Sequence, residues 1–312
     1  MMSEHNLYNF DDRNYMYHEV EGRAGRIMRR LNKPNLIKKF NKDIRSYLKT
    51  MNPSHFIYFK ASGLKPETLM TAKKMGAKTI GIFPDLDPRV YNQEYLDTLL
   101  ETDYFFHTKP NLIDYFRKKI NVRAKFIYPF FDPSQISAPL PVDESIGVSF
   151  VGHWSHGKEK SLINFCLSYT GNVSIFGEGW MNKRFEGVAA KVSVNGPVYG
   201  SAIQDIYRRS ICVLGLLMEK VSTDGKSDEI TSRSVLVPAN GGVLLHQKTE
   251  AANNLFQDSN QLLFSDIDHA VSLAEKIKRN NELRLELAAK QQSDVLKKAT
   301  NPSVFLKDLG LL

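Results

Sequence analysis

Short apolar runs, polar loops and longer amphipathic segments follow one another repeatedly along the chain. In the first half the apolar runs are HFIYF (55–59), KTIGIF (78–83), DYFFH (103–107) and AKFIYPF (124–130). Each run has the length of a strand, and after the first run we expect a helix through Thr68, Leu69 and Ala72. Strands that alternate with helices predict βαβ units and a parallel sheet, whose ligands collect at the carboxyl ends of its strands.

A proline-rich segment, DPSQISAPLPVDES (132–145), interrupts this order. Proline fixes φ and lacks an N–H group, so the segment is unsuited to regular structure and suited to a linker. We therefore predict a domain boundary between residues 138 and 139. The first domain is then 1–138, and the second is 139–312.

The strand and helix order restarts after the boundary. Its apolar runs are IGVSFVG (146–152), NVSIFG (172–177), VSVNG (192–196), ICVLGLL (211–217), VLLH (243–246) and QLLFS (261–265). Two segments rich in Ala, Leu, Glu and Lys close the chain as helices, about 267–278 and 281–299. The predicted fold is α/β, with two Rossmann-like doubly wound domains that face a central cleft.

Composition bounds the class of protein. The chain has 312 residues, 42% of them hydrophobic and 24% charged, which is typical of a globular protein with room for two domains. No apolar stretch approaches the roughly 18 residues that span a bilayer, and the N-terminus lacks the apolar core of a signal peptide. Cys166 and Cys212 lie in apolar runs without CxxC spacing, which predicts buried thiols, a cytoplasmic location and no metal site.

The positive charge is concentrated near the N-terminus. Residues 20–49 hold ten Lys and Arg against Glu21 and Asp43, an excess equal to the net charge of +8 of the whole chain. Apolar residues recur among these charges at helical spacing, so we expect amphipathic helices. Their basic face is either solvated, or it meets anionic lipid at the membrane surface or a polyanionic acceptor. Nucleic acid is disfavoured because no recognition motif is present.

Three loops that follow strands of the second half carry residues suited to phosphate. FVG-HWSHGKEK and IFG-EGW place glycines, histidines and a lysine there, and TSRS places Ser232 as a helix N-cap with Arg233 in the first turn. A helix N-terminus offers free N–H donors, and arginine adds a forked donor. Together these loops predict a diphosphate-binding rim. The alternative is that the glycines only mark turns and Ser232 only caps a helix.

The chain resembles the CgeB-like spore-maturation proteins, a branch of the GT-B glycosyltransferases close to glycosyltransferase family 4. The run DEITSRSVLVPANGGVLLHQKTEAANNLF (228–256) resembles the family signature. Further blocks match in the same order: FKASGLKPETL (59–69), GIFPDLDP (81–88), VSFVGHWSHGKEK (148–160) and SIFGEGW (174–180). The resemblance spans about residues 7–290 and implies a GT-B fold, a nucleotide-sugar donor held by the second domain, and no cofactor or obligatory metal.

The resemblance also implies roles for individual residues. Lys158 matches the lysine that meets the donor diphosphate, and His153 falls where many relatives have an arginine. Asp228 matches the first acidic residue of a pair that contacts the sugar. The remaining matches lie in donor-side loops and turns: Gly152, Gly177, Gly179, Asn195, Thr231, Ser232, Arg233, Gly241 and Gly242.

The chain departs from the family in two ways. Leu236 stands where a glutamate usually holds the donor ribose, and leucine cannot accept a hydrogen bond from a ribose hydroxyl. The segment NLYNFDDRNYMYHEV, which in relatives follows a first βα unit, begins here at residue 6. We therefore expect the N-terminal domain to lack that first βα unit.

In the first half, Asp85 and His107 are the candidate catalytic residues on the acceptor side. Asp85 and Asp87 lie between prolines in a turn after a strand, so acceptor contacts or a capping role are favoured over a metal site. His107 ends the next strand and could be a general base, although a lone histidine is more often structural. Trp154 and Trp180 could stack on a sugar or belong to the core.

Taken together, the sequence predicts a metal-independent, retaining glycosyltransferase of the hexosyltransferase type. It would move a sugar from a nucleotide sugar to an acceptor that is a glycan, a protein or a lipid-linked molecule. Two alternatives stay open: a catalytically weak GT-B-like partner subunit, and a nucleotide-sugar epimerase, which shares the fold.

Overall fold

The computed structural model describes residues 9–11, 15, 22–60, 63–84, 93–217 and 228–310. These residues form two compact units, which divide between Ile127 and Tyr128 rather than between residues 138 and 139. The proline-rich segment belongs to the second unit because it is hydrogen bonded there. Ser137 N donates to Ala239 O at 3.3 Å and Leu140 N donates to Arg208 O at 3.2 Å.

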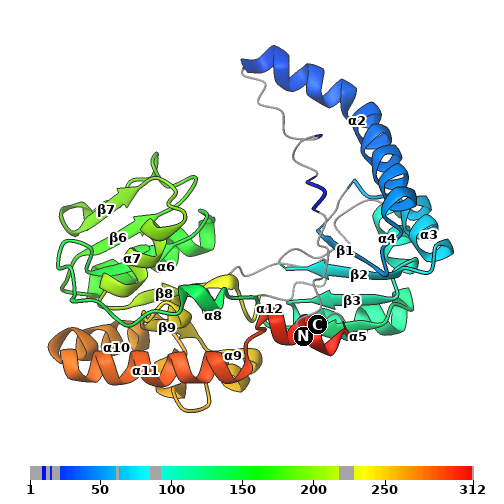
Figure 1. Ribbon diagram of the computed structural model, residues 1–312. Helices are drawn as coiled ribbons and strands as arrows, with labels where there is room; N and C mark the ends of the chain where they lie inside the picture. The colour runs from blue at the N-terminus through cyan, green and yellow to red at the C-terminus, as the bar shows by residue number, and fades with distance from the viewer. Residues whose placement is uncertain are drawn as a thin grey trace. The chain divides into compact units, whose positions relative to one another are not determined.

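The N-terminal unit is built on one four-stranded parallel sheet with the order β1-β2-β3-β4 (Figure 1). Its elements are α2 (Gly22–Met51), β1 (His55–Phe59), α3 (Pro66–Lys74), β2 (Lys78–Phe83), α4 (Gln93–Leu100), β3 (Tyr104–His107), a helical stretch of η2 (Pro110–Leu112), α5 (Ile113–Tyr115) and η3 (Phe116–Ile120), and β4 (Ala124–Phe126). Consecutive strands are neighbours, so right-handed crossovers place the connecting helices on one face. On that face α3 contacts both α2 and α4.

Close packing on this face requires a glycine in β2. Tyr58 of β1 pairs with Gly81, and a Cβ atom at Gly81 would lie 2.5 Å from the Tyr58 hydroxyl oxygen. The Tyr58 hydroxyl is bonded to Thr102 Oγ1 at 2.6 Å, so this buried polar group is satisfied. Phe40, Ile44 and Leu48 of α2 pack against the same cluster.

The second unit has a six-stranded sheet with the order β10-β9-β8-β5-β6-β7, in which all paired strands are parallel. Its elements are η4 (Pro133–Gln135), β5 (Val148–Val151), α6 (His156–Ser168), β6 (Val173–Phe176), η5 (Ala189–Lys191), β7 (Val192–Asn195), α7 (Ser201–Arg209), β8 (Val213–Gly215), α8 (Ser232–Ala239), β9 (Leu244–Gln247), α9 (Glu250–Leu255), η6 (Asn260–Leu262), β10 (Leu263–Phe264), α10 (Ile267–Arg279), α11 (Asn281–Lys298) and α12 (Pro302–Asp308). The strand order reverses between β5 and β8. This confirms the predicted doubly wound sheet and gives it a topological switch point.

Two cores cover the two faces of this sheet. Val148 and Phe150 of β5 pack with α6 and α10 on one face, and Val151 packs with α7, α8 and α9 on the other. The alternation along β5 is that of a strand buried on both sides. Cys166 and Cys212 are buried free thiols, as predicted.

The buried Arg284 of α11 joins three segments of the second unit. Its guanidinium donates to Ser210 O at 3.1 Å, to Leu140 O at 3.2 Å and to Arg208 O at 2.6 Å, and the side chain is only 1% exposed. Burial lowers the pKa of Arg284. The charge is tolerated because carbonyl oxygens surround it.

Replacing Arg284 should therefore destabilise the second unit strongly. Arg284→Ala leaves buried carbonyl oxygens without donors and should lower the free energy of unfolding by about 3 kcal/mol in urea titrations. Lys290→Ala, at an exposed site on the same helix, is the matched control and should change it by less than about 0.5 kcal/mol. Equal effects of the two variants would contradict this role of Arg284.

Candidate functional site

The carboxyl ends of β5 and β8 meet at the switch point of the second sheet, and two helices begin beside them. The loop after β5 leads into α6 at His156, and the loop after β8 leads into α8 at Ser232. Ser155 caps α6 by accepting from Lys158 N at 3.4 Å. Helix N-termini at the switch point of an open α/β sheet form a favourable environment for an anionic ligand.

The cap of α8 differs from the prediction by one residue. Thr231 is the N-cap, with extended backbone at φ −128° and ψ 172°, and Ser232 is the first helical residue and is exposed. Thr231 N donates to Ser234 Oγ at 3.0 Å. The prediction of Ser232 as the cap was therefore wrong. The helix begins one residue after Thr231 because the Ser234 side chain, in the first turn, accepts from the backbone of Thr231.

Arg233 ties the carboxyl ends of β5 and β8 together. Its guanidinium donates to Val151 O at 2.5 Å and to Leu216 O at 2.7 Å, and it lies 4.8 Å from the centre of the Phe150 ring. Burial lowers the pKa of Arg233. Its Nε atom is buried and has no hydrogen-bond partner among the described residues. The Nε–H group is therefore available to donate to a ligand at the switch point.

Lys158 lies beside this arginine. Its Nζ donates to His153 O at 3.3 Å, across the loop that leads into α6. Burial, together with the positive charge of Arg233, lowers the pKa of Lys158 to about 8. Arg233 therefore destabilises the charged form of Lys158, and an anion bound beside the two side chains would offset this effect.

The glycines of the two neighbouring loops allow this close approach. A Cβ atom at Gly152 would lie 2.4 Å from Arg233 Nη1, and one at Gly177 would lie 2.2 Å from Gly152 O. Gly177 and Gly179 also have φ angles of +144° and +82°, which glycine adopts most easily. Gly179 packs on Trp154, whose Cβ would be 2.9 Å from an added Cβ atom.

The other residues of these loops are exposed, join neighbouring loops or belong to the core. His153 is exposed, with Nε2 3.4 Å from Glu178 Oε2. Asn195 ends β7, and its backbone oxygen accepts from Gly177 N at 3.4 Å, which joins the β6 and β7 loops. Trp180 is fully buried and donates to Gly152 O at 2.7 Å, so it belongs to the core. Lys183 Nζ lies 3.7 Å from the centre of the Trp154 ring.

Three further residues predicted for the donor side, Asp228, Gly241 and Gly242, lie in the loops before and after α8. Asp228 is buried and lies in the loop between β8 and α8, three residues before the Thr231 cap. Gly241 and Gly242 lead into β9, so they lie at the amino end of a strand and not on the carboxyl edge. Added Cβ atoms would lie 2.5 Å from Ser137 O and 2.6 Å from Tyr207 O, respectively. Their role is to pack α8 against the proline-rich segment and α7, which corrects the predicted approach to the ligand.

The two candidate catalytic residues of the N-terminal unit have different outcomes. Asp85 lies outside the described residues, as does Asp87. His107 is fully buried, stacked on Phe83 and Phe116 at ring distances of 5.5 and 5.6 Å, and its Nδ1 accepts from Lys109 N at 2.9 Å. This surrounding is that of a structural histidine, the second of the two interpretations of this residue.

Sequence reasoning missed a polar relay behind α8. His246, at the end of β9, lies with Nδ1 2.6 Å from Gln247 O and with Nε2 2.8 Å from Ser234 Oγ. A carbonyl oxygen only accepts, so Nδ1 carries the hydrogen and Nε2 accepts from the Ser234 hydroxyl. Ser234 Oγ in turn accepts from Thr231 N, so the relay fixes the N-terminus of α8 and with it Arg233. Two features of the sequence could have indicated this relay. They are the run from Ser232 to Ser234 and the histidine that ends the apolar run 243–246.

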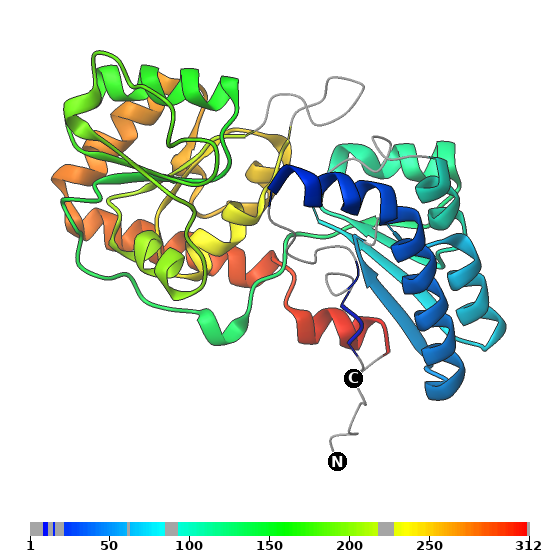
Figure 2. The same ribbon diagram turned by 90° about the horizontal axis from the view of Figure 1, so that it is seen from above.

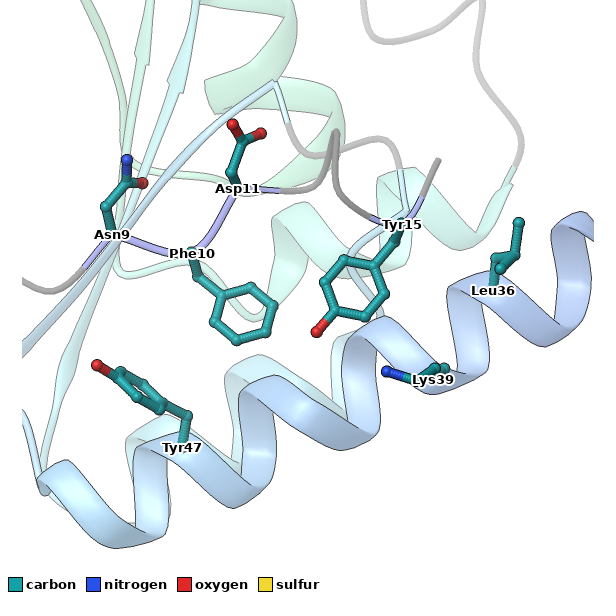
Figure 3. Close-up of a pocket in the computed structure, with 7 residues that line it drawn as sticks. All are labelled: Asn9, Phe10, Asp11, Tyr15, Leu36, Lys39 and Tyr47. Atoms are coloured by element: carbon teal, nitrogen blue, oxygen red, sulfur yellow. The ribbon is translucent and has the colours of Figure 1, made fainter. Parts of the chain in front are cut away.

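The N-terminal unit contains a cavity of about 640 Å³ that has different chemistry (Figure 3). Phe10, Tyr15 and Tyr47 line it, and Phe10 points toward α2 while Asp11 points away from it. Lys39 Nζ is bonded to Asp43 Oδ2 at 2.8 Å, and Tyr15 donates to the same oxygen at 2.9 Å. Since its lysine is already neutralised, the cavity is not suited to a diphosphate.

Residues 160–304 match a family model described as glycosyl transferase-like. No curated protein sequence gave a match. Among solved structures, HepE of Anabaena in complex with UDP superposes with a TM-score of 0.61 at 11% identity, over 88% of this chain and 81% of HepE. OtsA in its apo form gives 0.58 at 13% identity, over 89% and 78%. An alpha-glucosyltransferase in complex with UDP-glucose and DNA containing an abasic site gives 0.61 at 12%, over 86% and 83%.

These similarities show the fold, which is GT-B with two Rossmann-like domains, as predicted. The matched region begins after Lys158 and includes Arg233. No group of three or more metal-ligating side chains occurs among the described residues, and none of the described helices has the length and apolarity to cross a bilayer.

The relay predicts a pH dependence of stability. Burial, more than any other cause, lowers the pKa of His246 to about 4 from an ordinary value of 6.5. Between these values the unfolded chain binds a proton that the folded chain does not, so the free energy of unfolding should fall as pH falls from about 6.5 to 4. Chemical denaturation across this range should show a shallower pH dependence for His246→Gln.

The exposed His156 provides the matched control for this prediction. His156→Gln also removes one titratable ring, but it leaves the relay intact, so its pH dependence should follow that of the wild type. Identical pH profiles for wild type and His246→Gln would show that His246 is not held neutral.

Proposed function

We propose that the chain is a glycosyltransferase that holds a nucleotide-diphosphate sugar at the carboxyl edge of its second sheet. The observation that carries the proposal is the pairing of Lys158 with Arg233 at the switch point. Burial lowers the pKa of both side chains, and the positive charge of Arg233 helps to lower the pKa of Lys158 to about 8. A diphosphate carries the charge that would compensate both residues.

The same arrangement suits the chemistry of transfer. When the bond between the sugar and the diphosphate breaks, negative charge grows on the leaving phosphate. Lys158, Arg233 and the free N–H groups at the start of α8 are fixed donors for that charge before the reaction begins. We propose that they serve in place of a metal ion, so that nucleotide binding does not require Mg²⁺.

The finer parts of the proposal come from the family resemblance. From this resemblance we also propose that the configuration at the anomeric carbon is retained during transfer. The transferred sugar is a hexose, and Asp228 contacts it. HepE is described in complexes with UDP and with UDP-glucose, so uridine diphosphate is the first nucleotide to test. Asp85 stays the proposed acceptor-side residue. His107 is not retained as the base, because its ring is enclosed by aromatic side chains.

A thermal melt with UDP, GDP, TDP, CDP and ADP tests the donor site. A ligand held only by the folded chain stabilises it by about 2.7 kcal/mol at a hundredfold excess over Kd. We expect one nucleotide to raise the Tm equally with and without Mg²⁺, and Lys158→Ala to abolish the rise. Lys160→Ala, at an exposed position on the same helix, is the matched control and should keep it.

Each alternative function has its own outcome. Absence of a shift with every nucleotide would overturn the donor site and favour a partner subunit. Conversion of a nucleotide sugar to its epimer without an acceptor would favour the epimerase. Loss of the shift in Lys160→Ala as well as in Lys158→Ala would mean that general charge, and not this site, binds the nucleotide.

The depressed pKa of Lys158 makes a separate prediction. Above pH 8 the free protein loses the charge on this lysine, so nucleotide affinity should fall as pH rises from 7 to 9.5. Lys158→Arg keeps its charge throughout this range and should show a flatter affinity profile by calorimetry. Parallel profiles for the two proteins would remove Lys158 from the binding site.

A further inference from the structure

Helix α2 consists of two parts with different surroundings. In its second part Phe40, Ile44 and Leu48 are buried against the N-terminal unit. In its first part Ile27 and Leu31 are 61% and 72% exposed. These two residues are four apart and therefore share one face of the helix, which packs on none of the clusters described above.

Pro34 separates the two parts. Proline has no N–H group to donate to the carbonyl of Arg30, and its ring crowds that turn, so it bends a helix. Figures 1 and 2 show α2 bending along its length, with its first part extending past the strands and helices of its own unit. We call residues 22–33 the basic arm. Every described side chain from Arg30 to Asn35 is exposed.

The basic arm is poorly stabilised from within. It contains no acidic residue and carries five cations: Arg23, Arg26, Arg29, Arg30 and Lys33. Cations near a helix N-terminus oppose the macrodipole, and Gly22 and Gly25 reduce helix propensity. An external surface that neutralises the cations and buries the apolar face would supply the missing stabilisation.

The spacing of the arm defines what that surface must offer. Its apolar residues Ala24, Ile27, Met28 and Leu31 recur at i, i+3, i+4 and i+7, the spacing of one helical stripe. All five cations fall outside this stripe. A narrow apolar stripe flanked by Arg and Lys is the pattern of helices that lie in the interface of a bilayer.

We propose that the basic arm binds the anionic surface of a lipid bilayer, with Ile27 and Leu31 at the acyl boundary and the cations among the phosphates. A soluble polyanion would satisfy the charges and leave the apolar stripe in water. A second copy of the chain would bring five more positive charges to the same surface. Charge and apolar exposure together therefore select lipid, and the inference is independent of the donor site.

Flotation of the full chain with vesicles tests this surface. Vesicles of phosphatidylcholine with about 30% phosphatidylserine should bind at least about tenfold more protein than pure phosphatidylcholine, and 0.5 M salt should weaken the binding. Ile27→Ser/Leu31→Ser keeps every charge and should lower binding about tenfold or more. Arg30→Gln/Lys33→Gln should do the same through the loss of charge.

The matched control is Leu167→Ser/Leu285→Ser, which removes two exposed leucines from the second unit. It should leave vesicle binding unchanged, and the Tm of all variants should stay near that of the wild type. Far-UV circular dichroism should show a gain of helix on anionic vesicles for the wild type that is absent in Ile27→Ser/Leu31→Ser.

Three results would overturn the proposal. Vesicle binding that is unaffected by Ile27→Ser/Leu31→Ser would show that the apolar stripe takes no part. Binding to DNA or polyphosphate without binding to anionic vesicles would assign the arm to a soluble polyanion. A dimer in solution that Ile27→Ser/Leu31→Ser dissociates would assign it to self-association. None of these results affects the nucleotide melts, so the two proposals fail separately.

Discussion

The hydrogen bonds of the Arg233 guanidinium to the backbone of two strands are the interaction on which the site depends. The oxygens of Val151 and Leu216 belong to segments that diverge at the switch point, and one side chain holds both. This requires a residue without a side chain at Gly152, and Gly152 in turn requires another at Gly177. The position of one arginine therefore determines why the loops after β5 and β6 carry glycine at residues 152 and 177.

A partly buried arginine is costly unless other groups stabilise it, and Arg233 has no acidic partner within the part of the chain that the structure describes. Two carbonyl oxygens and the Phe150 ring offset part of that cost, and the relay from His246 through Ser234 holds the helix that carries the arginine. Lys158 adds a second cation beside the first and increases the cost. Such an arrangement is unfavourable as pure scaffolding and favourable as a preformed site for an anion, which is the reason for the function proposed here.

The sequence predicted the architecture well where strands are buried on both faces. KTIGIF coincides with β2, because a parallel strand with five of its six residues buried is a continuous apolar run. HFIYF also coincides with β1, although Tyr58 is the one buried residue of that strand. It predicted the cap of α8 one residue late, because Thr231, Ser232 and Ser234 are all good caps and only contact with His246 selects among them. The misplaced Gly241 and Gly242 could have been avoided, since a turn from a helix into a parallel strand lies at the amino edge. Burial of His107 could not be foreseen, because alternation along a four-residue strand allows either face.

A crystal structure of the chain with UDP bound would show directly whether the switch point of the second sheet holds the diphosphate. We expect phosphate oxygens within about 3 Å of Lys158 Nζ and of the first backbone N–H groups of α8, with Arg233 still bonded to Val151 and Leu216. A diphosphate bound away from Lys158 and Arg233, with the two cations unchanged beside an empty switch point, would contradict it.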